Sequence, residues 1–124
     1  ERLSSVIKTI ENETLQEGAD YYHAAVILQH SDKPEHYKLA NELCSKAIDL
    51  GEKRAKWLYA ATLDRYLLNT GEKYQKFGTQ YEKGENELWR LCPVDPETTD
   101  EMRAECNVPP LEKLKGREKE LNKK

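Results

Sequence analysis

Asp64 is the residue of this 124-residue chain whose position points most directly to chemistry. Helical spacing places it on the same face as Trp57, Ala61 and Leu68, so its carboxylate should point toward an apolar core. A buried carboxylate is costly unless it is paired or hydrogen-bonded. We therefore expect polar groups from distant parts of the chain to meet it.

Three groups are candidate partners for this carboxylate: His30, Arg103 and the backbone N–H groups of residues 74–81. In a structural interpretation, the N–H groups donate to Asp64 and pin their segment to the helix. In a catalytic interpretation, Asp64 orients His30, which acts as a general acid or base. Buried ionic groups often serve structure alone, which favours the first interpretation.

Established nucleophile and phosphate motifs are absent from the sequence. The segment GTQ at residues 78–80 lacks the lysine and the spacing of a phosphate-binding loop, and no G-x-S-x-G or C-x-x-C occurs. Cys44, on an apolar stripe, is typical of a small buried hydrophobe. Cys92 and Cys106 could pair in an oxidising compartment, but three reduced thiols are the simpler expectation.

The histidines do not form a metal motif. His23, His30 and His36 lack the spacing of a zinc site. A carboxylate-rich site made by His30, Asp32 and Asp64 is conceivable but has no motif behind it. The sequence therefore predicts no metal and no cofactor.

Composition indicates a globular chain that does not bind nucleic acid or membranes. The 20 basic and 23 acidic residues give a net charge of −3, and both signs interleave without a basic stripe. No apolar run approaches the ~20 residues that span a bilayer, and no signal peptide is recognised. We expect a cytoplasmic protein, although the chain begins at Glu1 and a trimmed N-terminus would leave secretion open.

Hydrophobic periodicity predicts helices throughout the first 70 residues. The second of these is apolar nearly all round, as expected for a helix inside the domain. Asp32 and Glu35 would form a capping box where the third helix begins at Pro34, and Gly51 and Gly71 would end the last two helices. The predicted helices cover residues 1–18 (short or frayed), 19–30, 34–50 and 52–69.

A different pattern follows in the segment YQKFGTQY at residues 74–81. Alternation of aromatic and polar residues predicts a strand there, then a turn, and a return strand over residues 87–91. We expect a β-hairpin or an ordered aromatic loop that covers the helices. Its aromatic side chains are more typical of a small core than of a ligand-stacking surface. They are Tyr74, Phe77, Tyr81 and Trp89.

Two short helices are expected at the C-terminal end. Thr98 or Thr99 can cap a helix that runs through Cys106, and Pro109-Pro110 opens a last helix whose charged tail should fray. The whole chain is then one small, mainly α domain with helical-hairpin packing of the TPR or Sel1-like kind, but without their repeat period. Its parts are residues 1–18, the helical core 19–70, the aromatic hairpin or loop 71–97, and the C-terminal helices 98–124 with a frayed tail.

Four segments together resemble the signature of a protein family. They are LQHSD (28–32), ATLDRYL (61–67), GEKYQKFGTQY (71–81) and TTDEMRAECNVPPL (98–111). Over residues 21–114 the chain is similar to a widespread, mostly bacterial domain of unknown function that carries Q-H-x-D, D-R-x-L, G-x-x-Q-x-[FY]-G-T-Q, D-x-x-R and P-P-L in this order. The family has no settled activity. The resemblance implies the signature positions His30, Asp32, Asp64, Arg65, Gln75, Gly78, Thr79, Gln80 and Arg103.

Two functions of different classes are compatible with these features. The first is a non-enzymatic module that binds a protein or peptide through its helical face and aromatic loop. The second is a small enzyme or small-molecule binder whose polar pocket is built on His30, Asp64, Arg65 and Gln80. The residues expected to bind a ligand in that pocket are Arg65, Gln75, Thr79, Gln80 and Arg103.

Overall fold

The computed structural model describes residues 17–123 of the chain. The weak helix that we predicted over residues 1–18 lies outside the described residues except for its last two positions. Within residues 17–123 the fold contains five helices and one two-stranded antiparallel sheet. The predicted class, a small mainly α domain with a short β-hairpin, is confirmed. None of the helices in this range has the length and apolarity that crossing a membrane requires.

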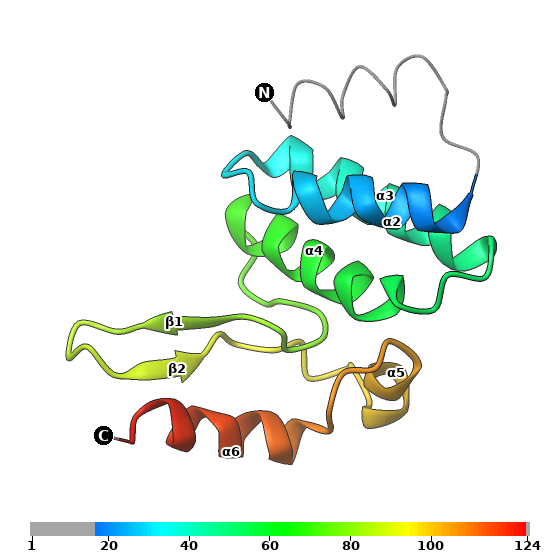
Figure 1. Cartoon of the computed structure of the whole chain (residues 1–124). Coiled ribbons are helices and arrows are strands. Elements are labelled where there is room, and N and C mark those ends of the chain that lie inside the picture. The colour runs from blue at the N-terminus through cyan, green and yellow to red at the C-terminus, as the bar shows by residue number, and fades with distance from the viewer. Residues whose placement is uncertain (1–16, 124) are drawn as a thin grey trace.

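The first three helices form one layer of the molecule (Figure 1). They are α2 (Gly18–Leu28), α3 (Pro34–Asp49) and α4 (Ala55–Asn69). α3 packs against both α2 and α4. Because the connections are short, successive helices run antiparallel, as in a helical hairpin with one more helix added.

The second layer lies below α4 in Figure 1 and consists of the hairpin and the C-terminal helices. Its elements are β1 (Tyr81–Lys83), β2 (Trp89–Leu91), α5 (Asp100–Glu105) and α6 (Leu111–Leu121). The hairpin extends away from α2, α3 and α4, and α6 runs beside β2.

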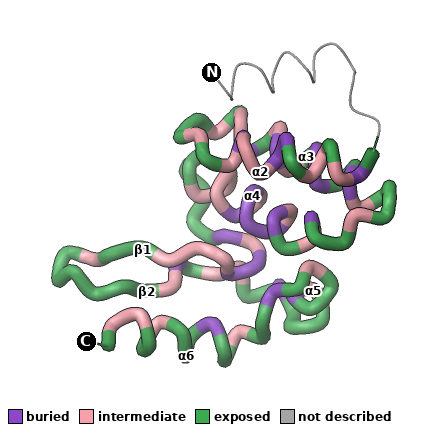
Figure 2. Tube along the Cα trace, viewed as in Figure 1, coloured by how far each residue is buried: buried purple, intermediate pink, exposed green. Residues whose placement is uncertain are grey.

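Small side chains dominate the core between α2, α3 and α4. Small residues at a helix contact let the axes approach closely, and Leu28, Leu43 and Leu58 fill the remaining space. Figure 2 shows the buried positions gathered where these helices face one another, whereas most of the hairpin is exposed. The alanines of this core are Ala24, Ala25, Ala40, Ala47 and Ala55.

The helix ends were predicted correctly at glycine and wrongly at the acidic cap. Gly51 has φ +92° and follows α3, and the N–H of Glu52 donates to the Ala47 carbonyl at 2.9 Å, which closes the helix end. The predicted capping box of Asp32 and Glu35 is absent. α3 is instead preceded by Lys33, whose N–H donates to the Ser31 hydroxyl at 3.2 Å.

The segment predicted as the first strand is a loop. Residues 74–80 pair with no neighbouring strand except at one isolated bridge, between Gln75 and Val94. The hairpin begins only at Tyr81, which pairs with Leu91. The physical reason is that the N–H groups of residues 76–79 all donate to one side chain of α4, so they are not available to a sheet.

The predicted aromatic core of the hairpin is also wrong. Only Phe77 is buried, with 5% of its surface exposed, whereas Tyr74 and Trp89 are each 36% exposed. Phe77 forms a second, smaller core between the two layers with Ala60, Val108 and Leu114. Tyr74 and Trp89 are therefore available at the surface, whereas Tyr81 is half-buried.

The C-terminal helices begin as predicted, but the last one is longer than expected. Thr99 caps α5, since its hydroxyl accepts the N–H of Met102 at 3.2 Å. α6 is helical to Leu121, through the charged tail that we expected to fray. The Asn122 amide explains this length: it accepts the N–H of Trp89 at 2.7 Å and donates to the Trp89 carbonyl at 2.9 Å. This side chain occupies the edge of β2 where a third strand would pair.

Replacement of Gly78 tests the close contact between the loop and α6. Gly78 has φ +116°, and a Cβ placed there would lie 2.6 Å from Cδ1 of Leu114. We expect Gly78→Ala to lower the free energy of unfolding by about 2 kcal/mol because the backbone becomes strained and Leu114 must move. Urea denaturation followed by circular dichroism measures this difference.

Gly116→Ala is the matched control on α6. Gly116 has open space around its Cβ position and an ordinary helical φ. The same substitution there should raise the free energy of unfolding by about 0.7 kcal/mol. Equal stability of Gly78→Ala and wild type would contradict the described contact.

Candidate functional site

The Asp64 carboxylate organises the loop that follows α4. Asp64 is fully buried, and its Oδ1 accepts the N–H groups of Lys76 and Phe77 at 2.8 and 2.9 Å. Its Oδ2 accepts the N–H groups of Gly78 and Thr79 at 3.1 and 3.0 Å and the Thr79 hydroxyl at 2.7 Å. Five donors thus converge on one carboxylate, and they compensate for its removal from water.

This geometry confirms the structural interpretation of Asp64 and contradicts its pairing with His30. His30 is exposed, and in residues 17–123 the only hydrogen bond of its ring is to Nε2 of Gln29, at 3.1 Å. Both Asp64 oxygens are occupied by the loop, so the carboxylate cannot orient an imidazole or accept a proton from a substrate. Arg103, the other predicted partner, does not contact Asp64 either.

A chain of hydrogen bonds nevertheless connects this loop to His30. The Gln80 amide donates to the Thr79 hydroxyl at 2.9 Å and accepts from Nε of Arg65 at 3.2 Å. Nη1 of Arg65 donates to both the side-chain oxygen and the backbone carbonyl of Gln29, the latter at 3.0 Å. Arg65 therefore joins the end of α2 to the loop after α4, and its Nε and Nη1 atoms are used for that purpose.

Gln75 braces the loop from inside. It is fully buried, and its Nε2 donates to the carbonyls of Cys92 and Gln80 at 2.9 and 3.0 Å. Its Oε1 accepts the N–H of Gln80 at 2.9 Å. The side chain thereby adds to the backbone pairing between the loop and the segment after β2, where the N–H of Cys92 donates to the Gln80 carbonyl at 3.1 Å, and it has no group left for a ligand.

Arg103 holds the loop from α5. Only 3% of its surface is exposed, and its guanidinium donates to the carbonyls of Phe77 and Thr98 at 3.4 and 3.1 Å. Its Nε donates to Oδ1 of Asp100 at 3.0 Å, and the same oxygen accepts the N–H of Leu111 at 2.9 Å. These two donors, Leu111 first, hold the pKa of Asp100 below its usual value.

The cysteines are free thiols with poor reactivity. Burial raises the pKa of Cys44 to about 12 and that of Cys92 to about 11, and it also raises the pKa of Cys106. The thiolate is the reactive form, so none of the three has the character of a nucleophile. The disulfide between Cys92 and Cys106 that the sequence left open is not formed.

The described residues contain no metal-binding cluster. Across residues 17–123, no three His, Cys, Asp or Glu side chains are grouped so that they could hold a metal ion. Asp32, one of the conceivable ligands, is exposed and forms no hydrogen bond in this part of the chain.

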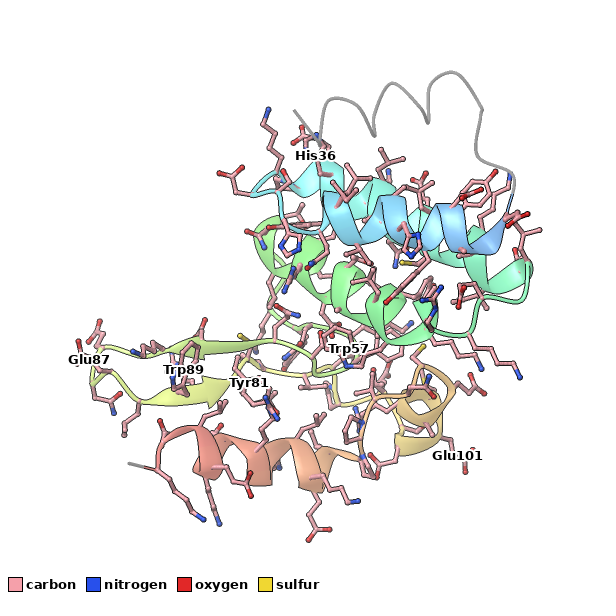
Figure 3. All side chains as sticks on the ribbon, viewed as in Figure 1. His36, Trp57, Tyr81, Glu87, Trp89 and Glu101 are labelled. Carbon is pink, nitrogen blue, oxygen red and sulfur yellow. The ribbon has the colours of Figure 1, made fainter. Side chains whose placement is uncertain are left out.

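A cleft of about 390 Å³ lies between α4, the loop and α6. Trp57 and Tyr81 line it, and Figure 3 shows Trp57 between α4 and the lower layer, with Tyr81 above α6. The Tyr81 hydroxyl donates to the Leu114 carbonyl at 2.8 Å, which fixes its ring. Burial raises the pKa of this phenol, and the charge of nearby Arg117 opposes part of the rise. The other lining residues are Gly78, Thr79, Val108, Pro109 and Leu114.

The sequence analysis did not identify Trp57 or Arg117, the exposed aromatic residue and the cation of this cleft, as binding residues. We predicted that Trp57 would share the buried face of Asp64, but Trp57 is 44% exposed. The loop after α4 covers Asp64, whereas Trp57 lies at the margin, against the cleft. Arg117 lay within a tail that we treated only as charged and fraying. The one available signal was residue type, since Trp, Tyr and Arg are enriched in binding hot spots.

A second hollow, of about 610 Å³, lies between residues 91–98 and α6. It is larger but has no aromatic side chain in its lining. Charges of both signs line it, including Asp95, Glu118, Lys115 and Lys119. The Trp57–Tyr81 cleft is therefore the better candidate for a specific apolar contact.

Comparison of the chain with family models, with curated proteins and with solved structures found no match. The resemblance to a bacterial domain family stays a prediction. Of the nine positions in its signature, all but His30 and Asp32 lie in or around the loop that follows α4. His30 joins them only through Gln29, and Asp32 stays apart.

Asp64→Asn tests whether the loop depends on the carboxylate. The new amide would point hydrogen atoms at N–H groups that now donate to Asp64, leaving buried donors unsatisfied. We expect the free energy of unfolding to fall by about 3 kcal/mol, measured by urea denaturation. Asp32→Asn, at an exposed carboxylate without hydrogen bonds, should change it by less than about 0.5 kcal/mol. Similar values for the two variants would show that the carboxylate does not hold the loop.

The Asp100 contacts predict a pH-dependent stability. The folded-state pKa is lowered from the ordinary value of 3.8, so the stabilisation by Asp100 is complete above that value and disappears as pH falls through the folded-state pKa. The difference in urea midpoint between wild type and Asp100→Asn should therefore be constant near neutral pH and shrink at acidic pH. A difference that stays constant across the acid range would contradict the described hydrogen bonds. Asp32→Asn should show no such trend.

Proposed function

We propose that this chain is a protein- or peptide-binding module, and that the Trp57–Tyr81 cleft is where it binds. The observation that carries the proposal is the exposed indole of Trp57 beside an apolar cleft whose other aromatic wall is already fixed. Trp and Tyr supply a large contact area at a small cost in conformational entropy.

The cleft has the size and composition of a site for one large side chain. A volume of about 390 Å³ lies within the usual range of ligand sites. Its floor is apolar, formed by Val108 and Leu114, and both residues belong to the second core. The floor and the Tyr81 wall are therefore fixed before a partner arrives, which lowers the entropic cost of binding.

The alternative function predicted from the sequence, a polar pocket for catalysis or a small molecule, has less support. It needs Asp64, Arg65 and Gln80 as free groups. Each of them is engaged within the protein, Asp64 by the loop and Arg65 by Gln29 and Gln80. A binding module needs none of these side chains to be free.

A single-tryptophan reporter tests the proposal. The chain has two tryptophans, so Trp89→Phe leaves Trp57 as the only indole. We expect a peptide array that varies two adjacent central positions through every amino acid to show binding only where one position is large and apolar. Titration with such a peptide should shift the Trp57 emission and saturate with a Kd of roughly 10 µM to 1 mM.

Two alanine variants locate the site. Trp57→Ala should weaken binding by about thirtyfold, the loss expected for a hot-spot residue, as measured by isothermal titration calorimetry because this variant lacks the reporter indole. Trp89→Ala removes an equally large side chain that is also exposed but lies on the hairpin outside the cleft, so it should leave the affinity unchanged. Absence of saturable binding, or equal loss in both variants, would refute the proposal.

A further inference from the structure

We propose that the partner of this cleft is a peptide segment in which a large apolar residue stands next to Asp or Glu. The apolar side chain would enter between Trp57 and Tyr81, and the carboxylate would bind Arg117. This inference rests on the proposed function and specifies the chemistry of its partner.

Among the residues that the structure describes, Arg117 is the only charged one in the lining of the cleft. It is exposed on α6, and within residues 17–123 its guanidinium takes part in no hydrogen bond or ion pair. Most of the buried or half-buried polar groups nearby are satisfied internally, including Tyr81 and Thr79. An unpaired guanidinium beside an apolar cleft is suited to a carboxylate, which it can bind through two parallel hydrogen bonds.

The neighbouring acidic residue does not neutralise Arg117. Glu118 follows it on α6, but Oε2 of Glu118 accepts the N–H of Leu91 on β2 at 2.8 Å and so faces the hairpin edge. Arg117 has no such contact. The electrostatic preference of the cleft is therefore for an anion, although the whole chain carries a net charge of −3.

Trp57 offers a second polar group at the same cleft. Its indole N–H has no acceptor within residues 17–123, and indole N–H groups usually find an acceptor once they are covered. A backbone carbonyl of a bound peptide is such an acceptor. A peptide that turns at this point could then use three contacts: its apolar side chain, one carbonyl and one carboxylate.

Four synthetic peptides, amidated at the C-terminus, separate these contacts. They share the frame acetyl-Gly-Ser-X-Z-Ser-Gly-amide, with X-Z being Leu-Glu, Ala-Glu, Leu-Gln or Leu-Lys. Titrated against the Trp89→Phe protein, Leu-Glu should bind about fivefold more tightly than Leu-Gln, and Leu-Lys should bind most weakly of the three leucine peptides. Added salt should reduce the difference between Leu-Glu and Leu-Gln.

Arg117→Gln should abolish the preference for Leu-Glu over Leu-Gln while leaving the affinity for Leu-Gln unchanged. The matched control is Lys119→Gln, a cation on the same helix that lines the other hollow. It should leave the preference intact. Loss of the preference in Lys119→Gln, rather than in Arg117→Gln, would place the peptide in the other hollow and overturn the inference.

The outcomes distinguish the inference from the function on which it rests. If Leu-Glu and Leu-Gln bind equally well and Trp57→Ala weakens both, the cleft binds apolar side chains but does not select a carboxylate, and only the inference fails. If Leu-Glu binds no better than Ala-Glu, the cleft does not accept an apolar anchor, and the proposed function fails with it. Binding of the Leu-Glu peptide that survives both Trp57→Ala and Arg117→Gln would likewise overturn both.

Discussion

One buried carboxylate sets the geometry of the lower half of this protein. Asp64 gathers four consecutive backbone N–H groups and one hydroxyl, so residues 76–79 curve around a side chain instead of pairing in a sheet. The arrangement resembles the anion-binding nests that backbone amides form in other proteins, with the anion supplied by the chain itself.

The remaining contacts between the two layers follow from the course of this loop. Gly78 lies so close to α6 that a Cβ would overlap Leu114, and Phe77 is directed into the core beneath. Arg103 then binds the Phe77 carbonyl from α5. The cleft at Trp57 is thus the margin of this assembly, where α4 extends past the loop that covers the rest of its face.

Side-chain amides also form hydrogen bonds to the backbone at places where a larger sheet would have a further strand. The Gln75 amide bridges the loop and the segment after β2, and the Asn122 amide covers the outer edge of β2. A two-stranded hairpin is marginal by itself and needs such support. The polar positions that appeared most suited to chemistry in the sequence are mostly of this kind, which is why the exposed Trp57 and Arg117 are the better candidates for binding.

The sequence alone determined the helical layer and the inward direction of Asp64. Apolar residues at a period near 3.6 specify which face of a helix is buried, and Gly51 and Gly71 mark the ends of α3 and α4, because both properties are local. Tertiary structure decided the conformation of residues 74–81. Their alternating pattern fits a strand as well as a loop, and they form a loop because the N–H groups of residues 76–79 donate to the distant Asp64 carboxylate. Tertiary structure also decided which residues stay exposed. Burial depends on the element that packs alongside, so Trp57 and Arg117 acquired their setting only when the loop and α6 came together.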